Sequence, residues 1–421
     1  EAWILLSNAY LYDFDFKMAK NALEKYSENG GKKKKIITNQ FQKIIGAESI
    51  YNQQQNISLK NLGSTINSSH SETHPLIDNK HKLLVYESNK DGVKGRVQLN
   101  GQFNNDIFYS RYDGYQFKIS RPLKKLNSNE NEKIIGFNDK GNTLYYSKTS
   151  PLNIKKGNLL IIQSKRRGLS FKKKVIFKAF NHIDKFNIHS IFYHEEGDMF
   201  FISAKEKGNK SKFQLYTIKK LPNEKLGQPV LILELSGSEN NISPFYHDET
   251  HTLYFSSDRP NGMGGYDLYN CPYNENENKW GEIENLGYPI NSPYDEKDIC
   301  LTKEGTNAFI SSIRNGGLGN YDLYYVSFLN EPVRRTIYLV EIHKDETQEN
   351  YEHLKLEIFN EKNILIGIYT PNEQTGIFTL ILEKGSYKIK GYVDKAVIFE
   401  KELKVSEFDI QEKINVIEYQ N

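Results

Sequence analysis

The sequence is short of cysteine and methionine and has no long apolar run. It contains 2 cysteines, Cys271 and Cys300, and 3 methionines in 421 residues. One cysteine pair does not define a disulfide framework, so two buried free thiols are expected, while a bond between them stays open. No apolar run approaches the roughly 18 residues that a membrane helix needs. The chain is therefore expected to have no transmembrane segment of its own.

An excess of charge of one sign is also missing. Lys and Arg number 56 against 53 Asp and Glu, which gives a formal net charge of +3. This balance provides no overall field that would draw the chain onto nucleic acid or acidic lipid, so no nucleic-acid partner is expected. The basic runs Lys32–Lys35 and Ser164–Gly168 are expected to be solvated loops or linkers, with phosphate binding as the alternative.

Aromatic residues, in contrast, are abundant. The chain has 28 Tyr and 23 Phe, with a hydrophobic share of 38% and a charged share of 26%. Aromatic side chains favour strands over helix bundles, and a chain of 421 residues suits two or three domains. A mainly β protein with several domains is expected.

Five segments share one plan, in which a short apolar strand, a polar turn and an aromatic-rich second strand follow one another. The second strands read "LVYES", "LYYSK", "FFISA", "LYFSS" and "AFISS". One equivalent position in them, spaced by 53 to 60 residues, holds Glu87, Ser147, Ser203, Ser256 and Ser311. A third strand follows in each unit and a fourth in four of them. Four antiparallel strands repeated in this way are typical of a β-propeller.

A repeated phrase indicates how the ring closes. "NLGSTINS" at Asn61–Ser68 returns as "NLGYPINS" at Asn285–Ser292, an offset of 224 residues. The second copy ends a fourth strand and leads into the next unit, whereas the first copy has no unit before it and the fifth unit lacks a fourth strand. Residues Asn56–Gly63 are therefore expected to complete the last sheet, which predicts a five-bladed propeller over 56–330.

Other patterns flank this region. Residues 1–55 are expected to be helical, and the spacing of a tetratricopeptide unit is matched by Trp3, Leu6, Ser7, Tyr10, Ala19 and Leu23, with Tyr26 as a departure. One such unit cannot bury its own face, so it should end a longer array or cap another surface. Residues 331–406 alternate as strands of a small Ig-like β-sandwich, and 407–421 are expected to be a tail or linker.

Glycine-rich loops in two units are expected to have a repeated structural role. Their residues are Gly264, Gly265 and Asp267 in one unit and Gly317, Gly319 and Asp322 in the next. These glycines, together with Gly262 and Gly316, should allow positive φ in a long loop, and the aspartates should accept hydrogen bonds from its backbone. A cation site is the alternative. The loops lack the Lys-Ser/Thr ending and the following helix of a phosphate loop.

These residues carry a resemblance. "YFSSDRPNGMGGYDLY" (Tyr254–Tyr269) and "FISSIRNGGLGNYDLYYV" (Phe309–Val326), with the repeated phrase, resemble the TolB-type, WD40-like propeller repeats of outer-membrane-associated proteins in Bacteroidota. Residues Thr375–Tyr392 resemble the carboxypeptidase regulatory-like domain, a non-catalytic sandwich. The order of helical repeat, propeller and regulatory-like domain is similar to PorE-type proteins of the type IX secretion and gliding machinery.

The resemblance implies a periplasmic, outer-membrane-associated protein whose partners are an outer-membrane β-barrel or lipoprotein complex. Such proteins usually continue into an OmpA-like peptidoglycan-binding domain, which this sequence does not contain, so a link to peptidoglycan is implied only for a longer parent chain. The sequence opens on Glu1 without a signal segment or a lipid-accepting cysteine, as expected of a processed or partial polypeptide.

Several stretches contain residue types that catalytic or metal sites use. "HDETH" at His247–His251 has the i, i+4 histidines of zinc proteases, but it aligns with strand-to-strand turns in the other units, where that geometry is lost. A glycosidase would need paired carboxylates near the centre of the ring. The predicted inner strands begin near Glu72, Glu132, Asn187, Asn241 and Asp298. These carboxylates are scattered, so no catalytic, metal or cofactor-binding residue is assigned.

The sequence thus predicts a non-enzymatic periplasmic scaffold, with a carbohydrate-active or cell-wall-fragment-binding propeller as the alternative. Substitution of Glu72 or Asp298 would test the alternative. Exposed loops of the fourth and fifth units are the predicted interaction face of the scaffold. The candidate residues there are Arg259, Pro260, Tyr266, Arg314 and Tyr321.

Overall fold

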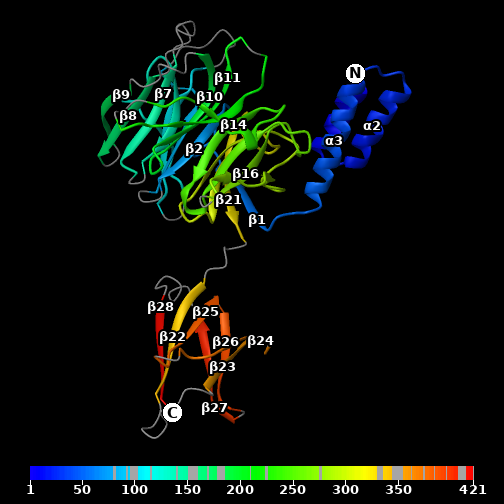
Figure 1. The fold of residues 1–421 in the computed structure, drawn as a ribbon. Coiled ribbons are helices and arrows are strands. Elements are labelled where there is room, and N and C mark those ends of the chain that lie inside the picture. The colour runs from blue at the N-terminus through cyan, green and yellow to red at the C-terminus, as the bar shows by residue number, and fades with distance from the viewer. Residues whose placement is uncertain are drawn as a thin grey trace. The chain divides into compact units, whose positions relative to one another are not determined.

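The chain folds into two compact units, Glu1–Leu329 and Asn330–Asn421 (Figure 1). The computed structural model describes residues 1–421 except 79–81, 92, 95–102, 114–115, 139–140, 150–159, 168–169, 178–184, 209, 223–225, 275–276, 330–334, 344–353, 362, 373–374, 384, 395, 406–413 and 421. Strands predominate in both units, as the aromatic composition predicts.

Three helices open the first unit: α1 (Ala2–Tyr12), α2 (Phe16–Glu28) and α3 (Lys34–Tyr51). Asp15 caps α2 because its side chain accepts a hydrogen bond from the Met18 backbone N–H. Ser7 and Ala19 are fully buried, and such small side chains let α1 and α2 pack closely. The basic run Lys32–Lys35 overlaps the start of α3, so only part of it forms the predicted loop.

Five antiparallel sheets follow in the described part of Glu1–Leu329. The first contains β2 (Glu72–Asp78), β3 (Leu83–Ser88), β4 (Asp106–Arg111) and β5 (Arg121–Pro122). The second contains β6 (Asn131–Phe137), β7 (Thr143–Thr149), β8 (Leu160–Arg167) and β9 (Ser170–Phe177). The third contains β10 (Phe186–His194), β11 (Met199–Glu206), β12 (Gln214–Lys219) and β13 (Val230–Leu231).

The fourth sheet contains β14 (Asn241–His247), β15 (Thr252–Ser257), β16 (Asp267–Asn274) and β17 (Lys279–Trp280), and β18 (Glu284–Asn285) also pairs with β16. The fifth contains β19 (Glu296–Leu301), β20 (Asn307–Ser312), β21 (Asp322–Phe328) and β1 (Ile57–Asn61). The inner strands contact one another in the cycle β2, β6, β10, β14, β19 and back to β2.

The closing pairing is the one that the repeated phrase predicts. β1 comes from the start of the unit and pairs antiparallel with β21 from its end, with Leu59 opposite Val326. This pairing gives β21 a second partner, so the last sheet has no open edge on that strand.

The two copies of the phrase build the same hydrogen-bond network. Asn67 exchanges hydrogen bonds with the backbone of Leu323 and donates to Asn61, at 2.8 to 3.0 Å. In the second copy Asn291 does the same with Leu268 and Asn285, at 2.7 to 2.8 Å. Each buried asparagine thereby bonds backbone groups of a third strand, β21 or β16, in the place of a ladder partner, which explains why the chain carries the phrase twice.

The basic segment Ser164–Gly168 is not a solvated loop. Residues 164–167 belong to β8, and Gly168 lies outside the described residues. A guanidinium nitrogen of Arg166 lies 2.6 Å from Asp78 Oδ2, with both side chains 3% exposed. Burial of this ion pair between the first and second sheets explains why a basic segment lies inside the fold. The predicted third strand at Gly157 is described only from Leu160 onward.

The described part of the second unit forms two sheets. One orders its strands β25 (Phe378–Glu383), β22 (Arg335–His343) and β28 (Ile414–Gln420), and the other β24 (Leu365–Tyr369), β23 (Leu354–Asn360), β26 (Gly385–Val393) and β27 (Ala396–Val405). Both sheets contribute to one core, in which Val340 and Phe378 pack with Leu356 and Ile389.

The predicted tail at 407–421 needs correction, because Ile414–Gln420 forms β28 and pairs in parallel with β22. Because β28 pairs in parallel, no hairpin turn connects it to β22, and the sequence therefore lacks the turn residues that would predict this strand. Residues 407–413 lie outside the described part of the chain.

Candidate functional site

Charged side chains meet where the inner strands converge. His74 has a φ of 47°, and its backbone N–H donates to Asp298 Oδ2 at 3.1 Å. Its ring lies between two carboxylates: Nε2 is 3.3 Å from Asp298 Oδ1, and Nδ1 is 3.5 Å from Glu87 Oε2. We call His74, Glu87, Lys133, His189 and Asp298 the axial cluster.

Burial and neighbouring charges shift the pKa values of this cluster in different directions. Burial raises the pKa of Glu87, against the opposing effect of His74 and Lys133. Burial also disfavours the Asp298 carboxylate, but His74 and the Ser311 hydroxyl outweigh it, so the Asp298 pKa is lowered. Burial, together with Lys133 and His74, lowers the pKa of His189 to about 3. His189 is therefore neutral at physiological pH.

The axial cluster also joins neighbouring sheets. The Ile134 N–H donates to Glu87 Oε1 at 2.7 Å, and the Lys133 ammonium donates to the His189 carbonyl at 2.9 Å. These bonds connect the first sheet to the second and the second to the third. A cavity of about 180 Å³ beside them is lined in part by His74, Lys133 and His189. Both carboxylates are held by protein partners, so the cluster has the chemistry of a structural connector.

The carboxylates that open the other inner strands do not gather at an open site. Glu72 accepts hydrogen bonds from the Ser68 backbone N–H and hydroxyl and from the Ser88 hydroxyl, at 2.7 to 2.9 Å. Glu132 pairs with Lys148 at 3.1 Å. Of the acids predicted near the starts of the inner strands, Asp298 alone belongs to the axial cluster. The other carboxylate of the cluster, Glu87, was predicted to lie on a second strand.

The two arginines predicted as interaction residues make contacts inside the chain. Arg314 donates to the Pro289 carbonyl at 2.8 Å and to Glu296 at 2.9 Å, and its side chain is 12% exposed. Arg259 donates to the Leu235 carbonyl at 3.1 Å and lies over the Tyr269 ring at 5.7 Å. Most of the hydrogen-bonding capacity of the Arg314 guanidinium is therefore used within the fold, and Arg259 is held through one guanidinium nitrogen and its contact with the ring.

The other predicted interaction residues are more accessible. Pro260 is exposed, and Tyr266 and Tyr321 are half-buried. The Lys297 ammonium lies 5.3 Å from the Tyr266 ring centre and 4.7 Å from that of Tyr321. These two tyrosines and Lys297 thus form a cation–π group between the fourth and fifth sheets.

The glycine-rich loops are held by their aspartates. Asp267 accepts from the backbone N–H groups of Met263 and Gly264, and Asp322 accepts from those of Leu318 and Gly319. Among the glycines expected to allow positive φ, Gly316 does so with a φ of 87°, whereas Gly262, Gly264, Gly265, Gly317 and Gly319 do not. Close packing is the reason for two of the others. A Cβ on Gly264 would lie 1.9 Å from the Tyr294 carbonyl oxygen, and one on Gly319 would lie 2.1 Å from that of His70.

The helices cover the glycine-rich loop of the fourth sheet. Met263 is fully buried in the core that they form, and Tyr288 packs against the same core. Tyr12 stacks on Tyr294 with ring centres 4.7 Å apart. The backbone of Gly46 passes so close to Asn261 that an added Cβ would lie 2.9 Å from its carbonyl oxygen. Part of the predicted interaction face is thus occupied by the chain's own helices, which cap this surface.

The "HDETH" stretch is a turn, as predicted. Asp248–Thr250 forms a short 3-10 turn between β14 and β15. His247 is buried rather than solvated, and its Nε2 lies 3.0 Å from the Thr302 carbonyl oxygen. Its Nδ1 lies 3.0 Å from the Thr250 hydroxyl. Both ring nitrogens are therefore engaged, and the protease-like pair of histidines is not formed.

Cys271 and Cys300 are buried free thiols. Burial raises the pKa of Cys271 to about 11 and that of Cys300 to about 12. Neither thiol is therefore a reactive nucleophile at neutral pH.

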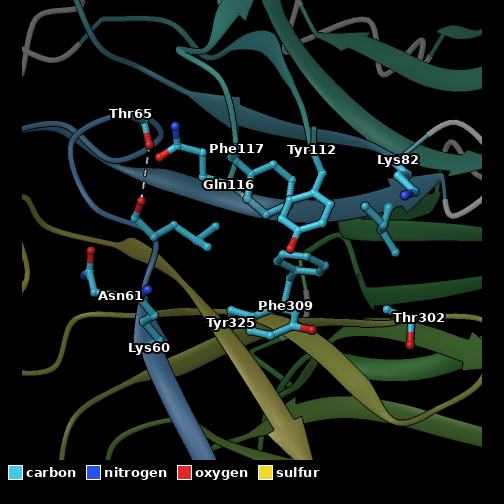
Figure 2. A pocket seen from close by; sticks show the side chains of 12 residues that line it. Lys60, Asn61, Thr65, Lys82, Tyr112, Gln116, Phe117, Thr302, Phe309 and Tyr325 are labelled. Atoms are coloured by element: carbon cyan, nitrogen blue, oxygen red, sulfur yellow. Dashed lines mark hydrogen bonds between the residues drawn. The ribbon is translucent and has the colours of Figure 1, made fainter. Parts of the chain in front are cut away.

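An aromatic cleft of about 490 Å³ lies at the seam between the first and fifth sheets (Figure 2). Four rings follow one another across it: Tyr112, Phe117, Phe309 and Tyr325, with successive ring centres 5.3, 5.7 and 5.3 Å apart. Tyr112 and Phe117 form a β-bridge after β4, and Phe309 and Tyr325 are paired on β20 and β21. The rings come from the first and the fifth sheet, which are far apart in the sequence. Contact between β2 and β19, together with the pairing of β1 with β21, brings these two sheets together.

Polar side chains surround these rings. The cleft is also lined by Lys60, Asn61, Thr65, Lys82, Gln116 and Thr302. Lys82 has a φ of 50°, and its carbonyl accepts from the Tyr112 N–H at 2.9 Å, which fixes the lysine beside the first ring. Among the described lining residues there is no carboxylate. An apolar cleft with a few amide, hydroxyl and ammonium groups is typical of a ligand site.

A second and larger hollow of about 740 Å³ opens among the turns that join the first and second strands of several sheets. Its wall includes Phe137, Phe192 and Phe245, and its edge includes Glu196 and Asp248. We call it the turn-face hollow.

The aromatic cleft was not predicted from the sequence. The signal for it was the aromatic segment "YDGYQF" at Tyr112–Phe117. The distance between this loop and Phe309 in the sequence conceals their contact.

No protein-family model matches the sequence, and no curated protein matches it. Solved structures with propeller-like folds are similar. A glycoside hydrolase is 7% identical with a TM-score of 0.46, over 67% of this chain and 94% of its own. A family-43 glycoside hydrolase is 14% identical with a TM-score of 0.40, over 62% and 91%. TolB from Acinetobacter baumannii is 15% identical with a TM-score of 0.36, over 64% and 63%. These similarities concern the fold alone.

Two expectations change with these findings. The prediction that the chain is not an enzyme is contradicted, because the similar structures include glycoside hydrolases and a luciferin-regenerating enzyme. The PorE-type resemblance is matched only at the level of a TolB-like, propeller-like fold.

Within the described residues, no helix has the length and apolar character that a membrane span requires.

Proposed function

We propose that the five sheets of the first unit are the blades of a propeller and that the aromatic cleft binds a carbohydrate chain. The row of rings from Tyr112 to Tyr325 carries this proposal. Sugar rings present apolar C–H faces that pack on aromatic side chains, while their hydroxyls need amide and hydroxyl partners. The cleft supplies both, with the Gln116 amide and the Thr302 hydroxyl among its lining groups.

The charge of the cleft indicates which class of carbohydrate it takes. Lys60 and Lys82 line it, and the described lining residues include no acid to neutralise them. Two ammonium groups favour a ligand that carries carboxylates, such as a glycan with acidic sugars or a cell-wall fragment with a peptide stem. We therefore propose an anionic cell-envelope glycan as the ligand.

Calorimetric titration of the full chain tests this function. Muropeptides and oligogalacturonate provide anionic glycans, and chitotetraose provides a neutral one. The anionic glycans should bind more tightly, and Lys60→Gln with Lys82→Gln should weaken them without affecting chitotetraose. Tyr112→Ala should weaken all three by about fivefold, since stacking on one ring contributes about 1 kcal/mol.

Two exposed positions outside the cleft provide matched controls, Lys17→Gln and Leu318→Ala. The proposal fails if the cleft variants and the controls bind alike. Chromatography of the same mixtures shows whether bound glycan is also cleaved.

We propose an envelope scaffold as the second candidate. The helices expose Leu5, Ile36 and Ile45, with exposed fractions of 69%, 48% and 55%, so these apolar side chains are accessible to a protein partner. In this proposal they bind an outer-membrane β-barrel or lipoprotein complex in the periplasm, and the resemblance favours one of the type IX secretion or gliding machinery. A longer parent chain would supply the link to peptidoglycan.

Co-purification from gently solubilised envelopes, followed by mass spectrometry, tests the scaffold. Recovery of a barrel protein with the wild type and its loss with Leu5→Ser and Ile45→Ser would support it. Recovery of the protein alone would contradict it. Pro260→Ala and Tyr266→Ala test in the same assay whether the predicted loop face contributes.

A further inference from the structure

Three side chains of the kinds that bind transition metals converge at the edge of the turn-face hollow. They are His194 at the end of β10, Glu196 in the turn that follows, and Asp248 in the equivalent turn of the next sheet. One potential ligand atom from each lies within 4.8 Å of the other two. We propose that His194, Glu196 and Asp248 form a zinc site.

The imidazole is held in place for this role. Its ring packs against Tyr246 with ring centres 4.9 Å apart. On its other side the backbone of Gly197 passes so close that a Cβ there would lie 2.6 Å from His194 Nδ1. The ring is therefore fixed between neighbours, with Nε2 toward Asp248. A ligand that is already oriented loses less entropy when it binds an ion.

The Nε2 atom of His194 is buried and faces one partner among the described residues, Asp248 Oδ1. With Glu196 as a second acid beside this pair, the three side chains offer one nitrogen and two carboxylates to a cation. The simplest competing explanation is an ion pair between protonated His194 and Asp248, which would not need Glu196.

The set of donor atoms favours zinc among the common ions. Zn²⁺ takes imidazole nitrogen together with carboxylate oxygens, whereas Ca²⁺ needs six to eight oxygen ligands and Mg²⁺ prefers oxygens and water. Three protein ligands leave a fourth position of a tetrahedral ion open. Because Glu196 and Asp248 also line the turn-face hollow, that position can be filled from the hollow by water or by an anionic oxygen of a ligand.

Titration with zinc chloride tests the site on the full chain after treatment with a chelator. The wild type should bind one Zn²⁺ at this site, and Co²⁺ in its place should give the visible absorption of a tetrahedral ion. His194→Ala and Asp248→Asn should each weaken binding by more than about tenfold, because even changes behind the ligands cost 10- to 100-fold. Glu196→Gln should weaken it as well.

Glu249→Gln and His251→Ala are the matched controls, because both residues lie in or beside the same turn but outside the set. Circular dichroism verifies that each variant is folded. Zinc binding unchanged by His194→Ala or Asp248→Asn would overturn the proposal, as would binding that Glu196→Gln leaves intact. The aromatic cleft is a different site, so glycan binding and zinc binding succeed or fail separately.

Discussion

Asp298 accepts a hydrogen bond at 3.1 Å from the backbone N–H of His74, a residue 224 positions earlier in the chain. The same offset separates the two copies of the repeated phrase. His74 lies on the inner strand of the first sheet and Asp298 on that of the fifth, so this bond belongs to the closure of the cycle of inner strands, together with the pairing of β1 and β21. One buried carboxylate thus connects the two ends of the unit.

Asp298→Asn should lower the free energy of unfolding by about 2 kcal/mol, because it removes the charge of a buried carboxylate that accepts hydrogen bonds from the His74 N–H and the Ser311 hydroxyl, and hydrogen bonds to charged groups contribute about 1.5 to 3 kcal/mol. The Asp298 pKa is lowered in the folded state, so its contribution is present above the unfolded pKa of about 4 and is lost as the pH falls through the folded value. Urea unfolding at pH 7 and at pH 3 measures both effects.

The exposed Asp91 provides the control substitution. Asp91→Asn should leave the unfolding free energy within about 0.5 kcal/mol of the wild type. A loss from Asp298→Asn no larger than that of the control would contradict a role in closure.

Glu87→Gln should behave differently, although Glu87 contacts the same histidine. The Glu87 pKa is raised mainly by burial, so ionisation of this group disfavours the folded state, and its relative contribution improves as the pH falls. Glutamine keeps an oxygen that can accept from the Ile134 N–H and needs no buried charge. The loss at pH 7 should therefore be smaller than for Asp298→Asn. Equal losses in parallel urea titrations would show that charge is not the deciding factor.

Periodicity predicts the sheets well wherever each element has a local signal. The aromatic second strands and the phrase at Asn61 were sufficient to predict the pairing of β1 with β21. The segment Ser164–Arg167 and the strand Ile414–Gln420 were missed for a common reason. Arg166 of the first segment forms an ion pair with Asp78 on a different sheet. The second segment pairs with β22, which is far away in the sequence.

The candidate site was harder to predict for the same physical reason. Phe117 and Phe309 lie 5.7 Å apart between ring centres, but no repeat register says which side chains of the first and last sheets face each other. Similarly, Gly319 lies close to the His70 carbonyl. The sequence alone shows only a glycine at this position, and a glycine in a loop predicts a turn. Contacts between sheets follow from packing, not from a pattern along one strand.

Asn67→Ala and Asn291→Ala should cost similar free energies, because the two side chains make equivalent bonds and both are buried. Each substitution leaves a backbone N–H and a carbonyl of the neighbouring strand without their partner, which corresponds to about 1 to 3 kcal/mol per unsatisfied group. Thermal and urea unfolding measure the losses, with exposed Ser64→Ala as the control. A large loss at one position and none at the other would show that the repeated phrase has two different roles.

Gly319→Ala should destabilise the first unit more than Gly316→Ala, although Gly316 is the one with a positive φ. Gly316 has a φ of 87° and no heavy atom within 4 Å of an added Cβ, so its substitution should cost about 1 kcal/mol through backbone strain alone. A Cβ on Gly319 would lie 2.1 Å from the backbone oxygen of His70 and 2.4 Å from that of Ser68. Backbone atoms cannot move aside as a flexible side chain can, so the loop must separate from the first sheet at a cost of about 3 kcal/mol. Urea unfolding of the two variants measures the difference, and the reverse order would mean that backbone conformation outweighs close packing in this loop.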